Sequence, residues 1–129
     1  MNVTNLQGKI SWAGILLIMV VGIIHLIEAP EHLEEATYVG VLFLINVLFA
    51  FVSAFGIYRG AQWGWVLGVL VAGGALVMYV VSRAVGLPGL DEDVGNWLET
   101  AGILSLIVEG LFVLVYAATA AQTTSEKRA

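Results

Sequence analysis

Four side chains with metal-binding chemistry lie within 11 residues near the end of the first apolar segment: His25, Glu28, His32 and Glu35. Imidazole and carboxylate groups are ligands that Zn, Fe, Mn or Cu ions accept, and histidines also ligate haem iron. The spacing lacks the His-Glu-x-x-His frame of zinc peptidases, and Pro30 is expected to interrupt the helix that would align both histidines. A metal ion or a haem is therefore one hypothesis, and a juxtamembrane acidic turn with one hydrogen-bonded histidine is the alternative.

Glu109 is a second candidate, because it lies near the middle of the last apolar segment. An ionisable group at that depth is costly and persists when it is paired, hydrated or functional. Residues at helical spacing around it are expected to form one stripe that faces protein rather than lipid: Gly102, Ser105, Glu109, Phe112 and Tyr116. Asn46, near the middle of the second apolar segment, is the expected partner at the same depth. A proton relay and a carboxyl group that fixes helix register are both compatible with this pattern.

Arg83 places a cation near the end of the third apolar segment, one helical turn after Tyr79. A buried arginine requires a carboxylate, and Glu28 or Glu109 is expected to supply it. Together these groups predict a buried polar cluster of six residues: His25, Glu28, Asn46, Tyr79, Arg83 and Glu109.

Signatures of catalysis are missing from the sequence. It has no Gly-x-Ser-x-Gly elbow, no phosphate-binding loop, no zinc-peptidase helix and no cysteine. The acidic run Asp91-Glu92-Asp93 lacks the ligand spacing of a calcium loop and predicts a solvated turn. The net charge of −5 argues against nucleic acid as a partner, since phosphate binding needs clustered Lys and Arg. We therefore favour a protein without enzymatic activity.

The composition places these residues in a membrane protein. Hydrophobic residues make up 60% of the 129 residues even without the 15 glycines, and charged residues make up 12%. Ordinary soluble domains are about 45–50% apolar and about 25% charged. Too few polar side chains are present to cover a surface that faces water. The length suits one domain, so residues 1–129 are expected to form a single integral membrane domain.

Four apolar runs are long enough to cross a hydrocarbon core about 30 Å thick: 10–29, 37–58, 63–85 and 97–120. Such segments satisfy their backbone hydrogen bonds in lipid as helices, so the sequence predicts an all-α fold, a four-transmembrane-helix bundle. Pro30 is expected to lie in the first turn of the second helix. Asn96 and Glu99 are expected to cap the start of the fourth. The segment Gly86-Leu87-Pro88-Gly89 predicts a turn.

The basic residues predict the orientation of the bundle. Four of the five fall on the side of the termini and Arg83 falls on the other: Lys9, Arg59, Lys127 and Arg128 make up the four. Because cytoplasmic loops carry the excess of Lys and Arg, both termini are expected in the cytoplasm. The predicted location is the cell membrane, as a multi-pass protein.

Small residues recur at every fourth position in two helices. One row contains Gly64, Gly68 and Ala72, and the other contains Gly56 and Gly60. Rows of this kind let helix backbones approach closely in a membrane. We expect them to pack the chain's own bundle rather than to form a dimer interface.

One stretch resembles a known pattern. The sequence Ser82-Arg83-Ala-Val-Gly86-Leu87-Pro88, with His25 in the first span and Glu109 in the last, is similar to small, uncharacterised prokaryotic four-span integral membrane proteins. The resemblance covers most of the chain loosely. It implies the four-span topology and directs attention to His25, Arg83 and Glu109, and it implies no activity.

Three functions are compatible with these features. The first is a non-catalytic accessory or scaffold component of a membrane complex, whose polar cluster locks the bundle. The second is a proton- or cation-linked binding or transport protein that uses Glu109. The third is a metal or haem protein centred on His25 and His32. The expected partners are the lipid bilayer and either other membrane subunits or further copies of the chain.

Overall fold

The computed structural model describes residues 3–129, with side chains from Leu6 onwards, and its helices are α1 (Val3–Glu35), α2 (Thr37–Tyr58), α3 (Gln62–Ala84) and α4 (Thr100–Arg128). A single 3₁₀ turn, η1 (Asp91–Asp93), lies in the loop between α3 and α4. All four α-helices are long and apolar enough to cross a membrane. The predicted fold class, an all-α four-helix bundle, is therefore confirmed.

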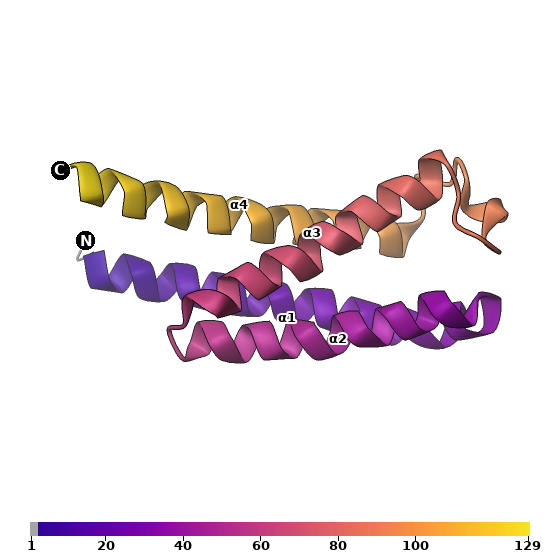
Figure 1. The fold of residues 1–129 in the computed structure, drawn as a ribbon, viewed down its shortest axis with the longest axis horizontal. Coiled ribbons are helices and arrows are strands. Elements are labelled where there is room, and N and C mark those ends of the chain that lie inside the picture. Colours follow the sequence, from indigo (N-terminus) through magenta and orange to yellow (C-terminus); the bar gives the residue numbers. More distant parts are fainter. Residues whose placement is uncertain (1–2) are drawn as a thin grey trace.

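The bundle has two distinct ends (Figure 1). The first and last helices begin and finish at one end, which we call the terminal end. The turn between α1 and α2 and the loop of residues 85–99 lie at the other, which we call the loop end. Which end faces the cytoplasm stays a prediction from the basic residues.

Helix α1 runs through Pro30 without a break and ends at Glu35. The prediction that Pro30 opens the second helix was wrong, since α2 begins at Thr37 after an extended Ala36. Packing against α2 explains why the helix persists despite the amide hydrogen that proline lacks. A Cβ atom added to Gly40 would lie 2.6 Å from the Cα atom of Leu33, so the last turn of α1 fits closely on the first turns of α2.

Helix α4 begins later than predicted, at Thr100. The expected capping box was wrong: the residue before the helix is Glu99, and its side chain makes no capping hydrogen bond. Asn96 lies in the preceding loop instead. That loop turns at glycines with positive φ, among them Gly86 at 99° and Gly89 at 80°, as predicted for this segment.

Small residues bring the helices together at the terminal end. A Cβ atom on Gly64 would overlap the backbone of Gly56 and Ile57, and one on Gly68 would overlap the ring of Phe112. Ser53 donates a hydrogen bond of 2.7 Å to the carbonyl oxygen of Gly64, which ties α2 to α3 at the same level. These small residues pack the chain's own bundle, but the prediction for Gly60 of the second row was wrong, since it lies in the turn after α2 with a φ of 72° and a Cβ atom there would contact no described residue of a neighbouring helix.

The core fills the same half of the molecule. Phe112 is fully buried and stacks on Trp65, with ring centroids 5.6 Å apart, and it packs among buried aliphatic side chains: Ile18, Val21, Ala50, Ala54, Ile57, Val71 and Ala72. Helix α3 crosses the bundle, from beside α2 at the terminal end to beside the start of α4 at the loop end (Figure 1). Helix α3 therefore separates from α2 toward the loop end, where the polar residues lie (Figure 1).

The contact between α2 and α3 gives a first prediction. Gly64→Ala should lower the midpoint of thermal unfolding, because a methyl group there overlaps backbone atoms of α2 and overpacking costs about 1–3 kcal/mol. The matched control is Gly110→Ala, since a Cβ atom there would meet no described atom within 4 Å beyond its chain neighbours and its own helix backbone. This control should keep or raise the midpoint, because alanine favours a helix by up to about 1 kcal/mol. Equal midpoints for the two variants in lipid nanodiscs would contradict the packing argument.

Candidate functional site

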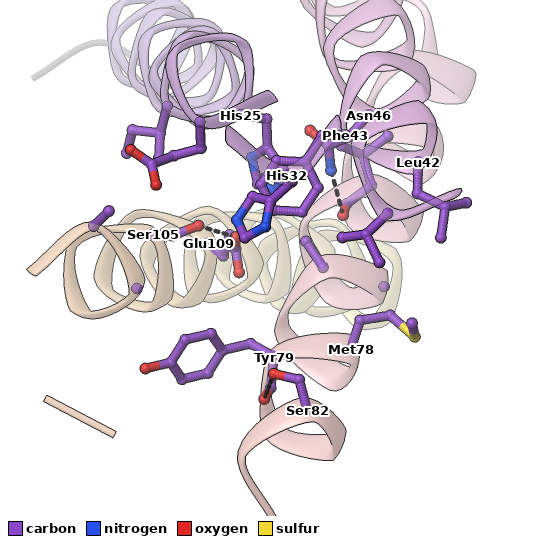
Figure 2. A pocket seen from close by; sticks show the side chains of 18 of the residues that line it. His25, His32, Leu42, Phe43, Asn46, Met78, Tyr79, Ser82, Ser105 and Glu109 are labelled. Atoms are coloured by element: carbon purple, nitrogen blue, oxygen red, sulfur yellow. Dashed lines mark hydrogen bonds between the residues drawn. The ribbon is translucent and has the colours of Figure 1, made fainter. Parts of the chain in front are cut away.

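A cavity of about 530 Å³ occupies the loop-end half of the bundle. All four helices and the loop of residues 85–99 contribute to its wall. Figure 2 shows labelled side chains from each of the four helices around this space. Its lining includes all six residues of the predicted polar cluster: His25, Glu28, Asn46, Tyr79, Arg83 and Glu109. The volume falls in the range of about 300–1,000 Å³ that holds small ligands.

Arg83 pairs with residues that the sequence interpretation did not choose. Its guanidinium group donates to Glu99 Oε2 at 2.7 Å and lies 3.2 Å from Asp93 Oδ2. It also donates to the carbonyl oxygen of Asn96 at 2.8 Å and to Ser82 Oγ at 3.0 Å. The expected pairing of Arg83 with Glu28 or Glu109 was therefore wrong. The acids come from the loop and the start of α4, because the later start of that helix leaves Glu99 free to turn toward α3.

This network holds the loop over the cavity. The carbonyl oxygen of Arg83 accepts a hydrogen bond of 2.8 Å from the amide of Gly95. The Arg83 guanidinium lies over the ring of Tyr79, 4.6 Å from its centroid, and the Tyr79 hydroxyl donates to the carbonyl oxygen of Trp97 at 3.2 Å. Leu87 and Leu90 in the same loop also line the cavity. The loop thus covers the loop end of the cavity.

Glu109 forms the deepest polar point of the cavity. It lies nine residues after Thr100, or roughly 14 Å along α4, and its side chain is 1% exposed. Ser105 donates a hydrogen bond to its Oε1 atom. Its Oε2 atom has no hydrogen-bond partner among the residues that the structure describes. We call such buried atoms unpartnered.

Asn46 lies in the same cavity but does not bond to Glu109. Its Nδ2 atom donates to the carbonyl oxygen of Val71 at 3.4 Å, and its Oδ1 atom is unpartnered. Figure 2 shows this bond between α2 and α3, apart from the Ser105 and Glu109 bond on α4. The expected pairing of Asn46 with Glu109 was therefore wrong. Asn46 Oδ1 and Glu109 Oε2 are both left without a hydrogen-bond donor among the described residues.

The two histidines share one face of α1, because the helix continues through Pro30 and seven residues make two turns. Both rings pack on Phe43 of α2, with centroid distances of 4.8 Å for His25 and 4.4 Å for His32. His25 Nδ1 donates to the carbonyl oxygen of Val21 at 2.8 Å. Since a carbonyl oxygen only accepts, Nε2 of the neutral ring is an acceptor.

The suggested metal ligands are not gathered into one site. His32 Nδ1 lies 3.2 Å from Glu35 Oε2, without the alignment of a hydrogen bond, and His25 is bonded to the backbone. Across the described part of the chain, no three His, Asp or Glu side chains are grouped closely enough to hold a metal ion. The donor set that the spacing suggested is therefore not assembled here.

The cavity opens sideways between α2 and α3. Several of its lining side chains are apolar and exposed on the outside of these two helices: Leu42, Ile45, Phe49, Leu70 and Met78. Figure 2 shows Leu42 and Met78 at this edge, away from Glu109. Both helices are candidate membrane spans by length and composition, and exposed apolar side chains are compatible with contact with lipid. At the other end Phe112 and Trp65 close the interior.

Some site residues were missed at the sequence level. Phe43 is one of several apolar residues in its segment, and periodicity alone does not distinguish it. Asp93 and Glu99 were noted as acids of a turn and a cap, not as partners of an arginine. Their signal was their closeness in sequence to Arg83, at separations of 10 and 16 residues.

Comparison of the chain with protein-family models, with curated proteins and with solved structures gives no match.

The Arg83 network gives a second prediction. Arg83→Ala should loosen residues 85–99, because it removes the cation that Asp93 and Glu99 share. Breaking a buried ion pair costs about 3–5 kcal/mol, and the exposure of the two acids, 22% and 38%, sets the expected loss below that range. Limited proteolysis of the loop in nanodiscs should be faster and the thermal midpoint lower.

Arg59→Ala is the matched control for this experiment. Arg59 follows the end of α2 and stacks over Phe55 at 5.8 Å, with no ion pair among the described residues. Exposed arginines contribute little to stability, so the control should behave as the unchanged protein. Equal proteolysis rates for both variants would show that Arg83 does not hold the loop.

Proposed function

We propose that this protein binds a small amphiphilic molecule inside the membrane. The observation that carries the proposal is the unpartnered Oε2 atom of Glu109, buried in a largely apolar cavity that opens toward lipid. Leaving a buried polar atom without a partner costs about 1–3 kcal/mol. A ligand whose polar group reaches this atom recovers that free energy, and its apolar part occupies the space between α2 and α3.

The alternative of a purely structural cluster is less well supported by the contacts. A carboxyl group that locks the bundle is expected to bond to another element, as Glu99 before α4 bonds to Arg83 on α3. Glu109 instead has its hydrogen bond within its own helix, to Ser105. Arg83 and Ser53 already connect neighbouring elements without it. The accessory or scaffold role in a membrane complex stays a prediction from the sequence. Such a role does not require the cavity.

The shape of the cavity favours a binding site over an open pore. On the terminal side of Glu109, the fully buried ring of Phe112 stacks on Trp65 and fills the interior. On the other side, the loop fixed by Arg83 covers the loop end of the cavity. The side between α2 and α3 is lined by exposed apolar side chains, so we infer that the ligand reaches the site from the bilayer. With the termini in the cytoplasm, as the basic residues indicate, this entrance lies in the outer leaflet.

Two adjacent glycines test the proposal. Gly74 lines the cavity and Gly73 does not, and a Cβ atom at either position would meet no described atom within 4 Å beyond its chain neighbours and its own helix backbone. Gly74→Phe should fill the cavity and abolish saturable binding, whereas Gly73→Phe places the same ring outside it and should leave binding unchanged. Radiolabelled decylamine, decan-1-ol and decanoic acid are suitable probes, measured in phosphatidylcholine nanodiscs against empty nanodiscs.

The proposal requires saturable binding of at least one probe to the unchanged protein and its loss in Gly74→Phe. Uptake that rises linearly with probe concentration, as in empty nanodiscs, would overturn it for these amphiphiles. Equal binding by the Gly74→Phe and Gly73→Phe variants would show that the probes bind elsewhere on the bundle.

A further inference from the structure

The charges around the cavity are predominantly negative. Four acidic residues line it and face one arginine: Glu28, Asp93, Glu99 and Glu109 are the acids, and Arg83 is the cation. After Arg83 has paired with two of these acids, Glu28 near the loop end and Glu109 at the deepest point remain. A ligand with a negative head group would meet these charges unfavourably.

Arg83 is not free to bind an anionic ligand. Its Nε atom donates to Asn96, and its two terminal nitrogens bond to Ser82, Asp93 and Glu99. The residue is 6% exposed, and Tyr79 covers one face of its guanidinium group. Binding a carboxylate or phosphate at this cation would require the loss of contacts that hold the loop.

The unpartnered oxygen atoms inside the cavity accept hydrogen bonds. Asn46 Oδ1 is an acceptor, since its Nδ2 atom is directed at the Val71 carbonyl oxygen. When its ring is neutral, His25 also offers Nε2 as an acceptor, because Nδ1 donates to the carbonyl oxygen of Val21. Glu109 offers Oε2, since Ser105 already donates to Oε1. The complement of these groups is a ligand head with several N–H donors and a positive charge.

We propose that the ligand is a lipophilic amine, whose ammonium group binds between Glu109 and Asn46 while its apolar part lies between α2 and α3. This inference rests on the proposed function and specifies its ligand class. Both protonation states of Glu109 lead to the same complex. A carboxylate accepts hydrogen bonds from an ammonium ion directly. A neutral carboxyl group meets the uncharged amine and transfers its proton, so that the O–H bond breaks as the N–H bond forms.

The experiment compares probes that share a decyl chain and differ in the head group. Decylamine should bind at least about tenfold more tightly than decan-1-ol or decanoic acid, because a charge-assisted hydrogen bond exceeds a neutral one by this order. Decyltrimethylammonium carries the charge without N–H donors and should bind less tightly than decylamine. Binding is measured in phosphatidylcholine nanodiscs, with the Gly73→Phe protein as a control that carries an added ring at a position that does not line the cavity.

Two variants assign the preference to the named atoms. Glu109→Gln keeps the shape of the side chain and should reduce the advantage of decylamine over decan-1-ol about tenfold. Asn46→Leu removes the second acceptor and should weaken decylamine binding while leaving decan-1-ol nearly unchanged. Helical circular dichroism identifies a variant that has not folded, and the remaining variant then decides.

The outcomes separate this inference from the proposed function. If decanoic acid or decan-1-ol binds saturably and as tightly as decylamine, the assignment of an amine ligand is overturned. The proposed binding function is then retained. A decylamine preference that survives in both variants, or in the folded one where only one folds, overturns the assignment to Glu109 and Asn46. The absence of saturable binding for all four probes overturns the proposed function and this inference together.

Discussion

The close approach of α3 to α2 at Gly56 and Gly64 is the constraint on which the cavity depends. Backbones meet there because neither position carries a side chain. From that contact α3 leans across the bundle toward α4 (Figure 1), so it cannot also follow α2 to the loop end. In a bilayer no hydrophobic drive closes the resulting space, since lipid tails are as apolar as the side chains that face them. The cavity is thus a consequence of where the small residues lie.

Arg83 connects the architecture of the loop to the electrostatics of the cavity. By bonding to Asp93, Asn96 and Glu99 it fixes the loop that covers the loop end. The same bonds occupy its donors, so the only lysine or arginine among the lining residues contributes no free positive charge to the interior. One residue therefore underlies two features of the proposed site, the lateral entrance and the preference for ligands that donate hydrogen bonds.

The number and type of the helices could be predicted from sequence, because the length of an apolar run and the need to satisfy backbone hydrogen bonds leave few options in lipid. The pairing of side chains could not. Periodicity predicts the face on which Glu109 lies, but the partner of Arg83 depends on the path of the loop and on the start of α4 at Thr100.

Pro30 likewise shows that the end of a helix cannot always be predicted from the local sequence. A proline inside a helix costs about 3 kcal/mol or more, yet α1 continues to Glu35 because its last turn packs on Gly40. Tertiary contacts of this kind are not visible in the local sequence. They place His32 two turns above His25 on the same face, where the sequence interpretation expected a turn between them.

The cost of leaving the Glu109 Oε2 atom without a hydrogen-bond partner determines which ligands the proposed site could distinguish. The apolar wall attracts any chain of suitable size, and apolar contacts distinguish poorly between such chains, since one methylene group is worth only about 1–3 kcal/mol. A buried acceptor acts differently. A ligand without a donor leaves Oε2 unpartnered and removes any water from it, whereas a donor satisfies the atom where the surroundings are least able to screen the bond. In the proposed site, affinity is therefore expected mainly from the space between α2 and α3, and selectivity mainly from the buried acceptors of Glu109 and Asn46.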